Sequence, residues 1–433
     1  MPHLRRRRLL AAAALAPVTG LAPESQAEAS SSNSAAPQRL VVAAFPMVDQ
    51  IIKSALPAWQ KAQGGIEVEV ISRQYDDHHT AMTTALSSSS GGAHLPDVMA
   101  LETMYMGRFS LGAGLQNLSL APYQAESLRE QFVPFAFEQA RNRDGAVVAL
   151  PTDIGPGSLF YRHDLLQRAG LNIKDLCESW ESYVQAGVQL KARTGAYLFA
   201  HARYLKDIVL FASTPAGQSI YFDAQGKPSI TSAHFQRAFQ LAQQSRQLGL
   251  DAIVDTWRND WSEHLRRGRL ATELSGAWMA GQMANSVAPS TKGLWRVSQL
   301  PGQSFAGWGG TYYSIPRRSD PAKKSLAWSL IQYLTLNRDL QLQGFKGQDA
   351  FPALLSAHED PFFDEPVEFL GGQRARQLWR EAARRIPARP LHRQNKFAEE
   401  VVNGELDNVL IYGKPIPQAL ADAQALLVHR ASR

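Results

Sequence analysis

The feature that most constrains this chain is the order of its predicted elements near the N-terminal end. A continuous apolar run at residues 40–45 is followed by apolar residues at helical spacing over 48–59. Residues 66–71 alternate between apolar and acidic side chains, 80–86 have a helical pattern, and 97–101 are again a short apolar run. This order of strand, helix, strand, helix, strand is typical of a mostly parallel sheet, whose ligands bind beyond the carboxyl ends of the strands.

Polar side chains stand on the loops predicted after these strands. Because the carboxyl ends of parallel strands meet at one edge of a sheet, we expect these side chains to face a common ligand. A carboxylate there can accept hydrogen bonds from a ligand hydroxyl, and such bonds are stronger when the acceptor is ionised. The candidates are Tyr75, Asp76, Asp77 and Glu102.

The run Asp76, Asp77, His78 and His79 is the one metal-like cluster in the sequence. Adjacent residues at the start of a helix point in different directions, whereas zinc requires ligands that converge. We therefore expect no metal site and no cofactor, and we expect an aspartate to cap the following helix.

A second lobe is expected after a strand that ends near residue 150. The Gly- and Pro-rich residues 152–157 are interpreted as a crossing between two lobes. Beyond them the pattern predicts a strand at 158–162, a helix closed by Gly170, and helices at 180–193 and 233–248. These elements would build a second α/β lobe.

The chain is then expected to return to the first lobe. A Gly-rich linker at 301–310 precedes a predicted strand at 311–315 and a helix around 327–336, and the C-terminal quarter has a helical pattern. The fold class is therefore α/β with two lobes, each a mostly parallel sheet flanked by helices, and a helical C-terminal segment. The predicted bounds are 39–150 and 307–357 for lobe 1, and 151–306 and 358–433 for lobe 2.

The N-terminus has the features of an export signal. Four arginines at 5–8 precede the apolar residues 9–16, and Ser25, Gln26 and Ala27 offer a small-residue cleavage site. We expect residues 1–27 to be removed and the Ser- and Ala-rich residues 28–38 to form a flexible leader; the general and the twin-arginine export routes both stay open. No cysteine follows the apolar stretch to carry a lipid anchor, and no later segment is apolar enough to span a membrane. These observations favour the periplasm.

The net charge and the cysteine content limit which partners and which covalent cross-links the chain can have. The formal net charge is +6, and the first 27 residues supply four positive charges and one negative, so +3 remains on the mature chain. An excess this small does not indicate a nucleic-acid partner. The single cysteine, Cys177, excludes an internal disulfide and is expected to be buried or half-buried. The arginine-rich stretch 374–393 is predicted to be a helix face exposed to solvent. The alternative is that it binds an anionic partner.

Known catalytic motifs do not occur in the chain. It has no G-x-S-x-G elbow, no H-E-x-x-H pair, no Walker loop and no G-x-G-x-x-G after a strand. A pair of carboxylates for glycoside cleavage is still available in Glu102 and Asp153, both on predicted cleft loops. A secreted glycoside-processing enzyme is therefore the alternative, but the sequence favours binding over catalysis.

Two of the nine tryptophans stand beside glycines rather than within periodic apolar runs. Trp278 follows Gly276 and Ala277, and Trp308 precedes Gly309 and Gly310. An indole in such a setting can lie against the C–H face of a sugar ring, because glycine permits close approach. The alternative for both is ordinary core packing, which is what we expect for the tryptophans on periodic helices: Trp59, Trp180, Trp328 and Trp379.

Four stretches together carry a resemblance to a known family. They are residues 95–98 (LPDV), 149–161 (ALPTDIGPGSLFY) with the Arg, Asp and Leu that follow, 274–278 (LSGAW) and 307–316 (GWGGTYYSIP). In this order, behind an export signal, they resemble the extracellular solute-binding proteins of ABC transporters, particularly the large sugar-binding group, family 1. The likeness covers most of the mature chain.

The resemblance implies a periplasmic binding protein fold whose two lobes close on a solute like a hinged trap. It implies a monomeric carbohydrate receptor, not an enzyme, that delivers a mono- or oligosaccharide to the transmembrane subunits of an ABC permease. By matching position, the sugar site would be lined by Asp153, Trp278, Trp308, Gly309 and Gly310, and less directly by Tyr75, Asp76 and Glu102, since that loop varies in such proteins.

The sequence departs from the family pattern at two places. His78 and His79 follow the acidic pair, and Tyr312 and Tyr313 add bulk after the glycines, so the pocket is expected to be reshaped. The ligand could also be a polyol, a sugar phosphate or a polyamine. For a phosphate we would expect arginines near the site, and the sequence offers Arg73, Arg108 and Arg162.

Overall fold

The computed structural model describes residues 39–88, 95–110, 114–215 and 217–431. The predicted signal peptide and leader, residues 1–27 and 28–38, lie outside the described residues. Within the described part of the chain, the structure has no helix with the length and apolar character that a membrane crossing needs.

The first lobe begins as the sequence predicts. Strands β1 (Arg39–Ala44), β2 (Glu67–Ser72) and β3 (Val98–Glu102) pair in parallel in the order β2-β1-β3. Helix α1 (Val48–Ala62) follows β1 and buries the apolar face on which its residues recur at helical spacing. Helix α2 (Tyr75–Ser87) begins five residues earlier than predicted.

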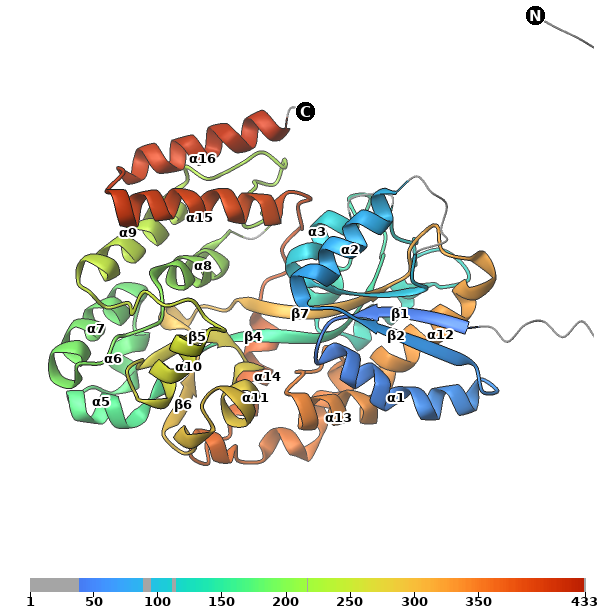
Figure 1. Cartoon of the computed structure of the whole chain (residues 1–433), viewed down its shortest axis with the longest axis horizontal. Helices are drawn as coiled ribbons and strands as arrows, with labels where there is room; N and C mark the ends of the chain where they lie inside the picture. The colour runs from blue at the N-terminus through green and yellow to red at the C-terminus, as the bar shows by residue number, and fades with distance from the viewer. Residues whose placement is uncertain (1–38, 89–94, 111–113, 216, 432–433) are drawn as a thin grey trace, which may run out of the picture. The chain divides into compact units, whose positions relative to one another are not determined.

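Two long strands connect the two lobes. Strand β7 (Gly307–Ser314) pairs antiparallel with β3, and β4 (Leu150–Arg162) pairs antiparallel with β7 along its first half. The second half of β4 pairs with β5 (Thr272–Gly276) and β6 (Trp295–Ser298). In Figure 1, β4 and β7 run between the two groups of elements. The predicted break at 152–157 is therefore part of one continuous strand.

The second lobe differs from prediction in its strand pairing. We expected a mostly parallel sheet there, but β4 is antiparallel to both β5 and β6, and the parallel contacts are isolated bridges such as Tyr197 with Leu270. Helices surround these strands: α5 (His163–Ala169), α6 (Ile173–Cys177), α7 (Trp180–Thr194), α8 (Ala202–Ser213), α9 (Ala233–Gln247), α10 (Asn259–Arg266) and α11 (Met279–Gln282). The class, a two-lobed α/β fold, is as predicted.

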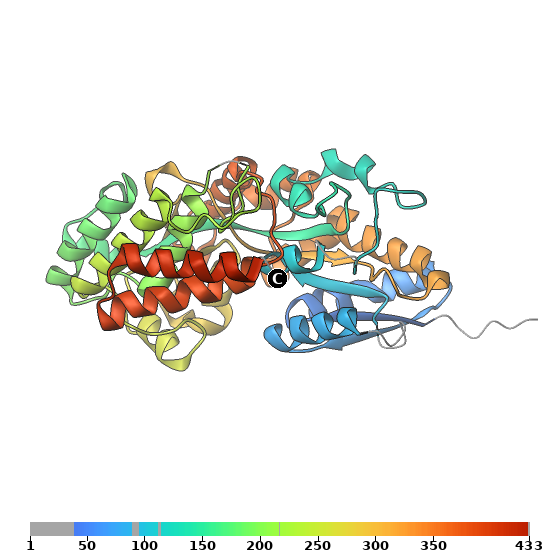
Figure 2. The ribbon, with the colours of Figure 1, turned by 90° about the horizontal axis from the view of Figure 1, so that it is seen from above.

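The C-terminal quarter is helical, as predicted. Helices α12 (Lys324–Leu336) and α13 (Arg338–Gln348) pack on the first lobe with α1. Helix α14 (Ala375–Arg385) lies against β4, and the antiparallel pair α15 (Asn395–Tyr412) and α16 (Ile416–Ala431) covers α9 of the second lobe, side by side in Figure 2. Two shorter helices are α3 (Thr103–Ser110), which follows β3, and α4 (Pro134–Gln139), which precedes β4. The residue bounds of the lobes stay a prediction.

Apolar packing continues from one lobe to the other. One core cluster contains residues of β1, β3, α1 and α12 together with residues of α10, β6 and α14. A second cluster fills the space between α5, α7, α8, α9, α15 and α16. The four tryptophans expected in the core are buried, and Cys177 is half-buried, as predicted.

The arginine-rich stretch is not a simple solvated face. Arg376 lies over the ring of Phe362 at 3.7 Å, and Arg389 is buried and donates a hydrogen bond to the carbonyl of Thr214 at 3.1 Å. The helix pattern showed only that some arginines share a face. It did not show that the ring of Phe362, from a turn that precedes the helix, covers part of that face.

Candidate functional site

Glu102 forms the centre of a polar cluster at the end of β3. The hydroxyl of Tyr75, in the first turn of α2, donates a 2.8 Å hydrogen bond to Glu102 Oε2, and the backbone N–H of Met104 donates another of 2.7 Å. Only 8% of the Glu102 surface is exposed. Burial raises the pKa of Glu102 to about 7, although both hydrogen bonds act to lower it.

His79 holds two parts of this cluster together. Its Nδ1 lies 2.7 Å from the carbonyl oxygen of Tyr75, and its Nε2 accepts a 3.1 Å bond from the backbone N–H of Glu102. An acceptor at Nε2 requires the proton to be on Nδ1, so the neutral tautomer is fixed. Burial lowers the pKa of His79 to about 3. The ring also stacks on Tyr105, with centroids 4.0 Å apart.

The two aspartates do not act as predicted for the helix start. Gln74 occupies the N-cap position of α2, and no side chain caps that end. Asp76 instead accepts a 3.2 Å hydrogen bond from the hydroxyl of Tyr105. Asp77 is exposed and makes no such bond within the described chain. Among the described residues, no group of His, Cys, Asp and Glu side chains is arranged to hold a metal ion.

The N-terminal end of α15 lies next to this cluster. Lys396 lies 5.9 Å from the ring centre of Tyr105 and pairs with Glu399 at 2.7 Å. The backbone just before α15 touches α3 so closely that a Cβ atom on Gly107 would overlap the carbonyl of His392. The sequence did not indicate Lys396, since a contact across nearly 300 residues leaves no local signal, and it placed His79 near the site without giving it a role.

Trp278 lies in a notch between three strands. Its indole Nε1–H donates a 2.9 Å hydrogen bond to the carbonyl oxygen of Trp308. Gly155 of β4 and Gly276 of β5 line the notch, and a Cβ atom on either would overlap this pair of groups. Glycine at these positions is therefore required by the close approach of Trp278 to the strands.

Gly309 lies beside both the indole of Trp278 and the carboxylate of Glu102. A Cβ atom there would lie 3.3 Å from Trp278 Nε1 and 3.9 Å from Glu102 Oε1. The φ angle of Gly309 is 84°, in the region that favours glycine. Glu102, Trp278 and the backbone of Trp308, which come from three different elements, therefore converge around one glycine. The ring of Trp308 is half-buried and lies 5.2 Å from that of Phe211.

Asp153 stands in one row with Glu102. Thr311 of β7 is paired with Glu102 of β3 on one side and with Asp153 of β4 on the other. Residues paired directly across strands share a face of the sheet. Burial raises the pKa of Asp153 to about 6, while a hydrogen bond with Thr311 acts to lower it. Asp153 also lines a small cavity of about 10 Å³ with Thr152, Tyr313 and Gln341, room for about one water molecule. Gly310 leaves space for the backbone of Asp153.

The arginines considered for a phosphate ligand do not gather at this site. Arg162 donates two hydrogen bonds to Asp164, at 2.8 and 2.7 Å, and lies over the ring of Trp295. Arg73 and Arg108 are exposed. The cation beside Glu102 is Lys396, whose charge acts to lower the pKa of that carboxyl.

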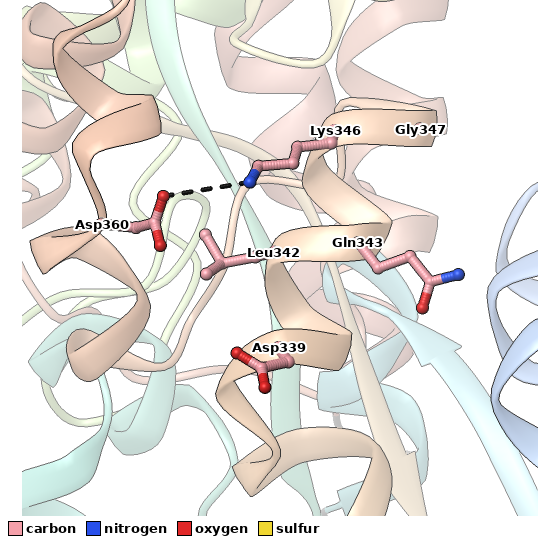
Figure 3. Close-up of a pocket in the computed structure, with 6 residues that line it drawn as sticks. All are labelled: Asp339, Leu342, Gln343, Lys346, Gly347 and Asp360. Atoms are coloured by element: carbon pink, nitrogen blue, oxygen red, sulfur yellow. Dashed lines mark ion pairs between the residues drawn. The ribbon is translucent and has the colours of Figure 1, made fainter. Parts of the chain in front are cut away.

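A separate groove of about 500 Å³ lies on the surface of α13. It is lined by Asp339, Leu342, Gln343, Lys346, Gly347 and Asp360, and Figure 3 shows Lys346 directed at Asp360 across it. These two groups are 3.9 Å apart, and Arg338 also pairs with Asp360 at 3.0 Å. The groove contains none of the side chains predicted for the ligand site.

Comparison with known proteins identifies relatives of this chain. Residues 54–370 match the family model described as bacterial extracellular solute-binding protein. The lactose-binding protein of Rhizobium radiobacter is 24% identical over 287 residues, which are 64% of this chain and 66% of the relative, slightly less than two thirds. The arabinooligosaccharide-binding protein of Halalkalibacterium halodurans is 23% identical over 335 residues, 74% of this chain and 72% of the relative.

A solved structure shows the same fold. It is the ABC transporter associated binding protein from B. animalis subsp. lactis in complex with beta-1,6-galactobiose, with a TM-score of 0.73 and 21% identity. The superposition covers 91% of this chain and 97% of that one. The family and these relatives are binding proteins.

Proposed function

Because this chain belongs to the bacterial extracellular solute-binding proteins, we propose that it is a periplasmic receptor that captures a mono- or oligosaccharide and delivers it to an ABC importer. The family is described as extracellular, and the predicted signal peptide supports export to the periplasm. The sugar-binding relatives support a carbohydrate as the ligand.

The observation that carries this proposal is the convergence around Gly309. The carboxylate of Glu102, the indole of Trp278 and the backbone of Gly309, which has no side chain to obstruct a ligand, lie together there. A neutral sugar needs these three features: a hydrogen-bond acceptor, an apolar surface and room for close approach. The indole supplies an apolar surface for the C–H face of the ring. Glu102 accepts hydrogen bonds from hydroxyl groups, and Tyr75 holds that carboxylate in position.

The other predicted residues have supporting roles in this proposal. Asp76 and Asp77 stand at the rim formed by the first turn of α2 and contact the distal part of a ligand. Asp153 lies two strands from Glu102 in the same row and accepts a second set of hydroxyl bonds when the solute is bound. Trp308 and Gly310 complete the wall between them.

Closure of the two lobes on a ligand would bring together side chains that lie on different lobes. Gln282, at the end of α11, places its amide nitrogen 2.9 Å from the sulfur of Met47, which precedes α1. Asp349, after α13, lies where a Cβ atom on Gly281 would be. We propose that these contacts form when the lobes close on the solute, and that the permease recognises the closed form.

The test is a sugar panel on the purified mature protein, read by melting temperature and by tryptophan fluorescence. We expect at least one saccharide to shift both signals, and Trp308→Ala to weaken its binding by about 1–3 kcal/mol, by analogy with the stacking of bases on aromatic side chains. Tyr412→Ala, which removes a ring that is 79% exposed at the end of α15, is the matched control and should leave affinity unchanged.

Three outcomes would contradict the proposal or a part of it. A panel that also includes polyols, sugar phosphates and polyamines but shifts neither signal with any sugar would remove the carbohydrate assignment. Retained affinity with reduced stability in Trp308→Ala would assign that ring to packing against Phe211. Release of reducing ends from an oligosaccharide, abolished in Asp153→Asn, would establish the enzyme instead of the receptor.

A further inference from the structure

Asp349 brings a carboxyl group to a contact between the two lobes. It follows α13, which packs on α1 and α12 of the first lobe. Gly281 lies in α11, which follows β5 of the second lobe. The Asp349 carboxylate lies directly against Gly281, because a Cβ atom on that glycine would overlap Asp349 Oδ2. The next residue of α11, Gln282, contacts Met47 of the first lobe, so the two contacts belong to one edge.

The backbone holds this carboxyl group in place. Asp349 ends α13 with a φ of 52°, in the left-handed region that aspartate adopts more readily than most residues, and its N–H donates a 3.0 Å hydrogen bond to the carbonyl of Phe345. Two residues later, Phe351 is fully buried, with its ring 5.1 Å from that of Phe345 and 5.5 Å from that of Phe363. The carboxyl group is therefore anchored from both sides and cannot easily move away from Gly281.

The charged groups of the neighbouring elements are engaged elsewhere. Helix α11 has no charged residue. On α13, Lys346 is directed at Asp360, as Figure 3 shows. On α1, Asp49 pairs with Lys53 at 2.8 Å. Among the described residues, no N–H or O–H group donates a hydrogen bond to the carboxylate that lies against α11.

Arg376 of α14 is the cation that acts on Asp349, and it compensates the carboxylate only in part. Its guanidinium lies over the ring of Phe362 at 3.7 Å and donates a 3.2 Å hydrogen bond to the carbonyl of Glu365. Asp153 of β4 is an acid and offers no compensation. Burial therefore raises the pKa of Asp349 to about 7, although the charge of Arg376 acts to lower it.

Separation of the lobes would expose this carboxyl group to water. Its pKa would then return toward the ordinary value near 3.8, because the cost of burial disappears. A group with a higher pKa in the closed form takes up a proton on closure. Its contribution to closure is fully present below about pH 4 and is lost as the pH rises through about 7.

We propose that closure of the lobes is linked to protonation of Asp349, because the carboxyl group meets Gly281 across the contact between the lobes without a hydrogen-bond donor. This inference rests on the proposed function. Its consequence is that the receptor holds a sugar more tightly in acidic than in alkaline surroundings. The contact also sets how far the lobes can approach, since nothing larger than glycine fits at position 281.

The test compares wild type with Asp349→Asn, whose amide stays neutral. Lactose and arabinotriose are titrated calorimetrically into both proteins from pH 5.5 to pH 8. The affinity of the variant relative to wild type should rise by about tenfold or more over this range. Glu102 and Asp153 are present in both proteins, so their titration cancels in the ratio.

Proton uptake gives a second reading of the same titration. At pH 6, in two buffers of different ionisation enthalpy, wild type should take up close to one proton more per bound sugar than Asp349→Asn, since the group is mostly ionised in the open form and mostly protonated in the closed form. A purely structural role of Asp349 would change affinity without changing the number of protons.

Glu273→Gln is the matched control. Glu273 is a buried carboxyl group of β5 whose only hydrogen bond among the described residues comes from Trp261 at 3.3 Å, and burial raises its pKa to about 8. Because it is buried within the second lobe, closure does not change its exposure. The variant should have the same dependence of sugar affinity on pH as wild type.

Gly281→Ala tests the contact itself. The new methyl group would overlap the Asp349 carboxylate and hold the lobes apart, so sugar affinity should fall by about tenfold or more at every pH. Unchanged affinity in Gly281→Ala, or the same pH dependence and proton uptake in wild type and Asp349→Asn, would overturn the inference and leave the proposed function intact. A wild type that binds neither these two sugars nor any other of a broad panel would remove the proposed function and the inference together.

Discussion

Glu102 is a carboxyl group that the fold removes from water at the end of a strand. Its pKa of about 7 in the folded protein lies above the ordinary value near 4.5, because burial disfavours the ionised form. The stability that Glu102 contributes is therefore fully present at low pH and is lost as the pH rises from about 4.5 through 7. Near neutral pH, the unfavourable ionisation of buried Glu102 therefore lowers the free energy of unfolding of the protein.

Glu102→Gln isolates this effect. The amide remains neutral and its oxygen can accept the bonds from Tyr75 and Met104, so the difference in unfolding free energy between variant and wild type should rise by about 1–3 kcal/mol from pH 5 to pH 8. Chemical denaturation at several pH values measures it. Glu178→Gln, at an exposed position after α6, is the control and should give a flat difference. A flat difference for Glu102→Gln as well would mean that the carboxylate is solvated.

The sequence predicted part of this residue cluster, for a clear physical reason. Tyr75 and Glu102 follow parallel strands, and strand ends on one edge of a sheet meet whatever the side chains are. His79 was predicted to be near but was given no role, because a histidine in the first turn of α2 can face water or the sheet. Lys396 could not have been predicted, since its approach depends on how α15 packs against α3.

At the scale of elements, glycine and proline misled the sequence analysis at β4. Residues 152–157 have the composition of a loop, yet β7 pairs with them on one side and the last part pairs with β5 on the other. Irregularities in register near Asp153 and Pro156 absorb the proline, as bulges do. Similarly, α2 extends back to Tyr75 because its buried face is made of His78, His79 and Met82, and histidine does not count in an apolar pattern.

A Gly→Ala change should destabilise the protein where packing requires glycine, as in β4, and stabilise it in an open helix position, as in α15. In Gly155→Ala the new methyl group would overlap the carbonyl of Trp308, so we expect a loss of about 2 kcal/mol or more and a changed environment of Trp278. Gly404 lies in the middle of α15 with open space around it, so Gly404→Ala should stabilise the protein by about 0.5–1 kcal/mol. Urea denaturation with intrinsic fluorescence measures both, and equal effects of the two changes would refute the assignment.

At the scale of the whole molecule, the alternation of strands and helices was enough to predict a two-lobed α/β fold, because chain connectivity leaves few other arrangements. The pairing in the second lobe was not predictable from that alternation. Strands β5 and β6 are short, and β4 enters the second lobe from the first in a direction that makes β5 and β6 antiparallel to it. Contacts between the lobes also depend on side chains far apart in the sequence.

One of those contacts reports closure directly. In the structure the side chains of Met47 and Gln282 meet, with 2.9 Å between sulfur and amide nitrogen, although one precedes α1 and the other ends α11. If the lobes open without ligand, this pair separates. We therefore predict that Met47→Cys with Gln282→Cys, in a Cys177→Ser background, reacts with a short bifunctional thiol reagent much faster when a binding sugar is present.

A second pair of cysteines serves as the control for this measurement. Gln63 and Ser329 lie 3.4 Å apart within the first lobe, between the end of α1 and helix α12, so opening does not separate them. Gln63→Cys with Ser329→Cys should cross-link at a rate that the sugar leaves unchanged. Because ligand binding can shift a conformational equilibrium only through different affinities for its two states, a sugar that binds without accelerating the first pair would mean that binding and closure are not coupled. In that case the receptor would hold its ligand in a preformed site, and the hinge would have no part in capture.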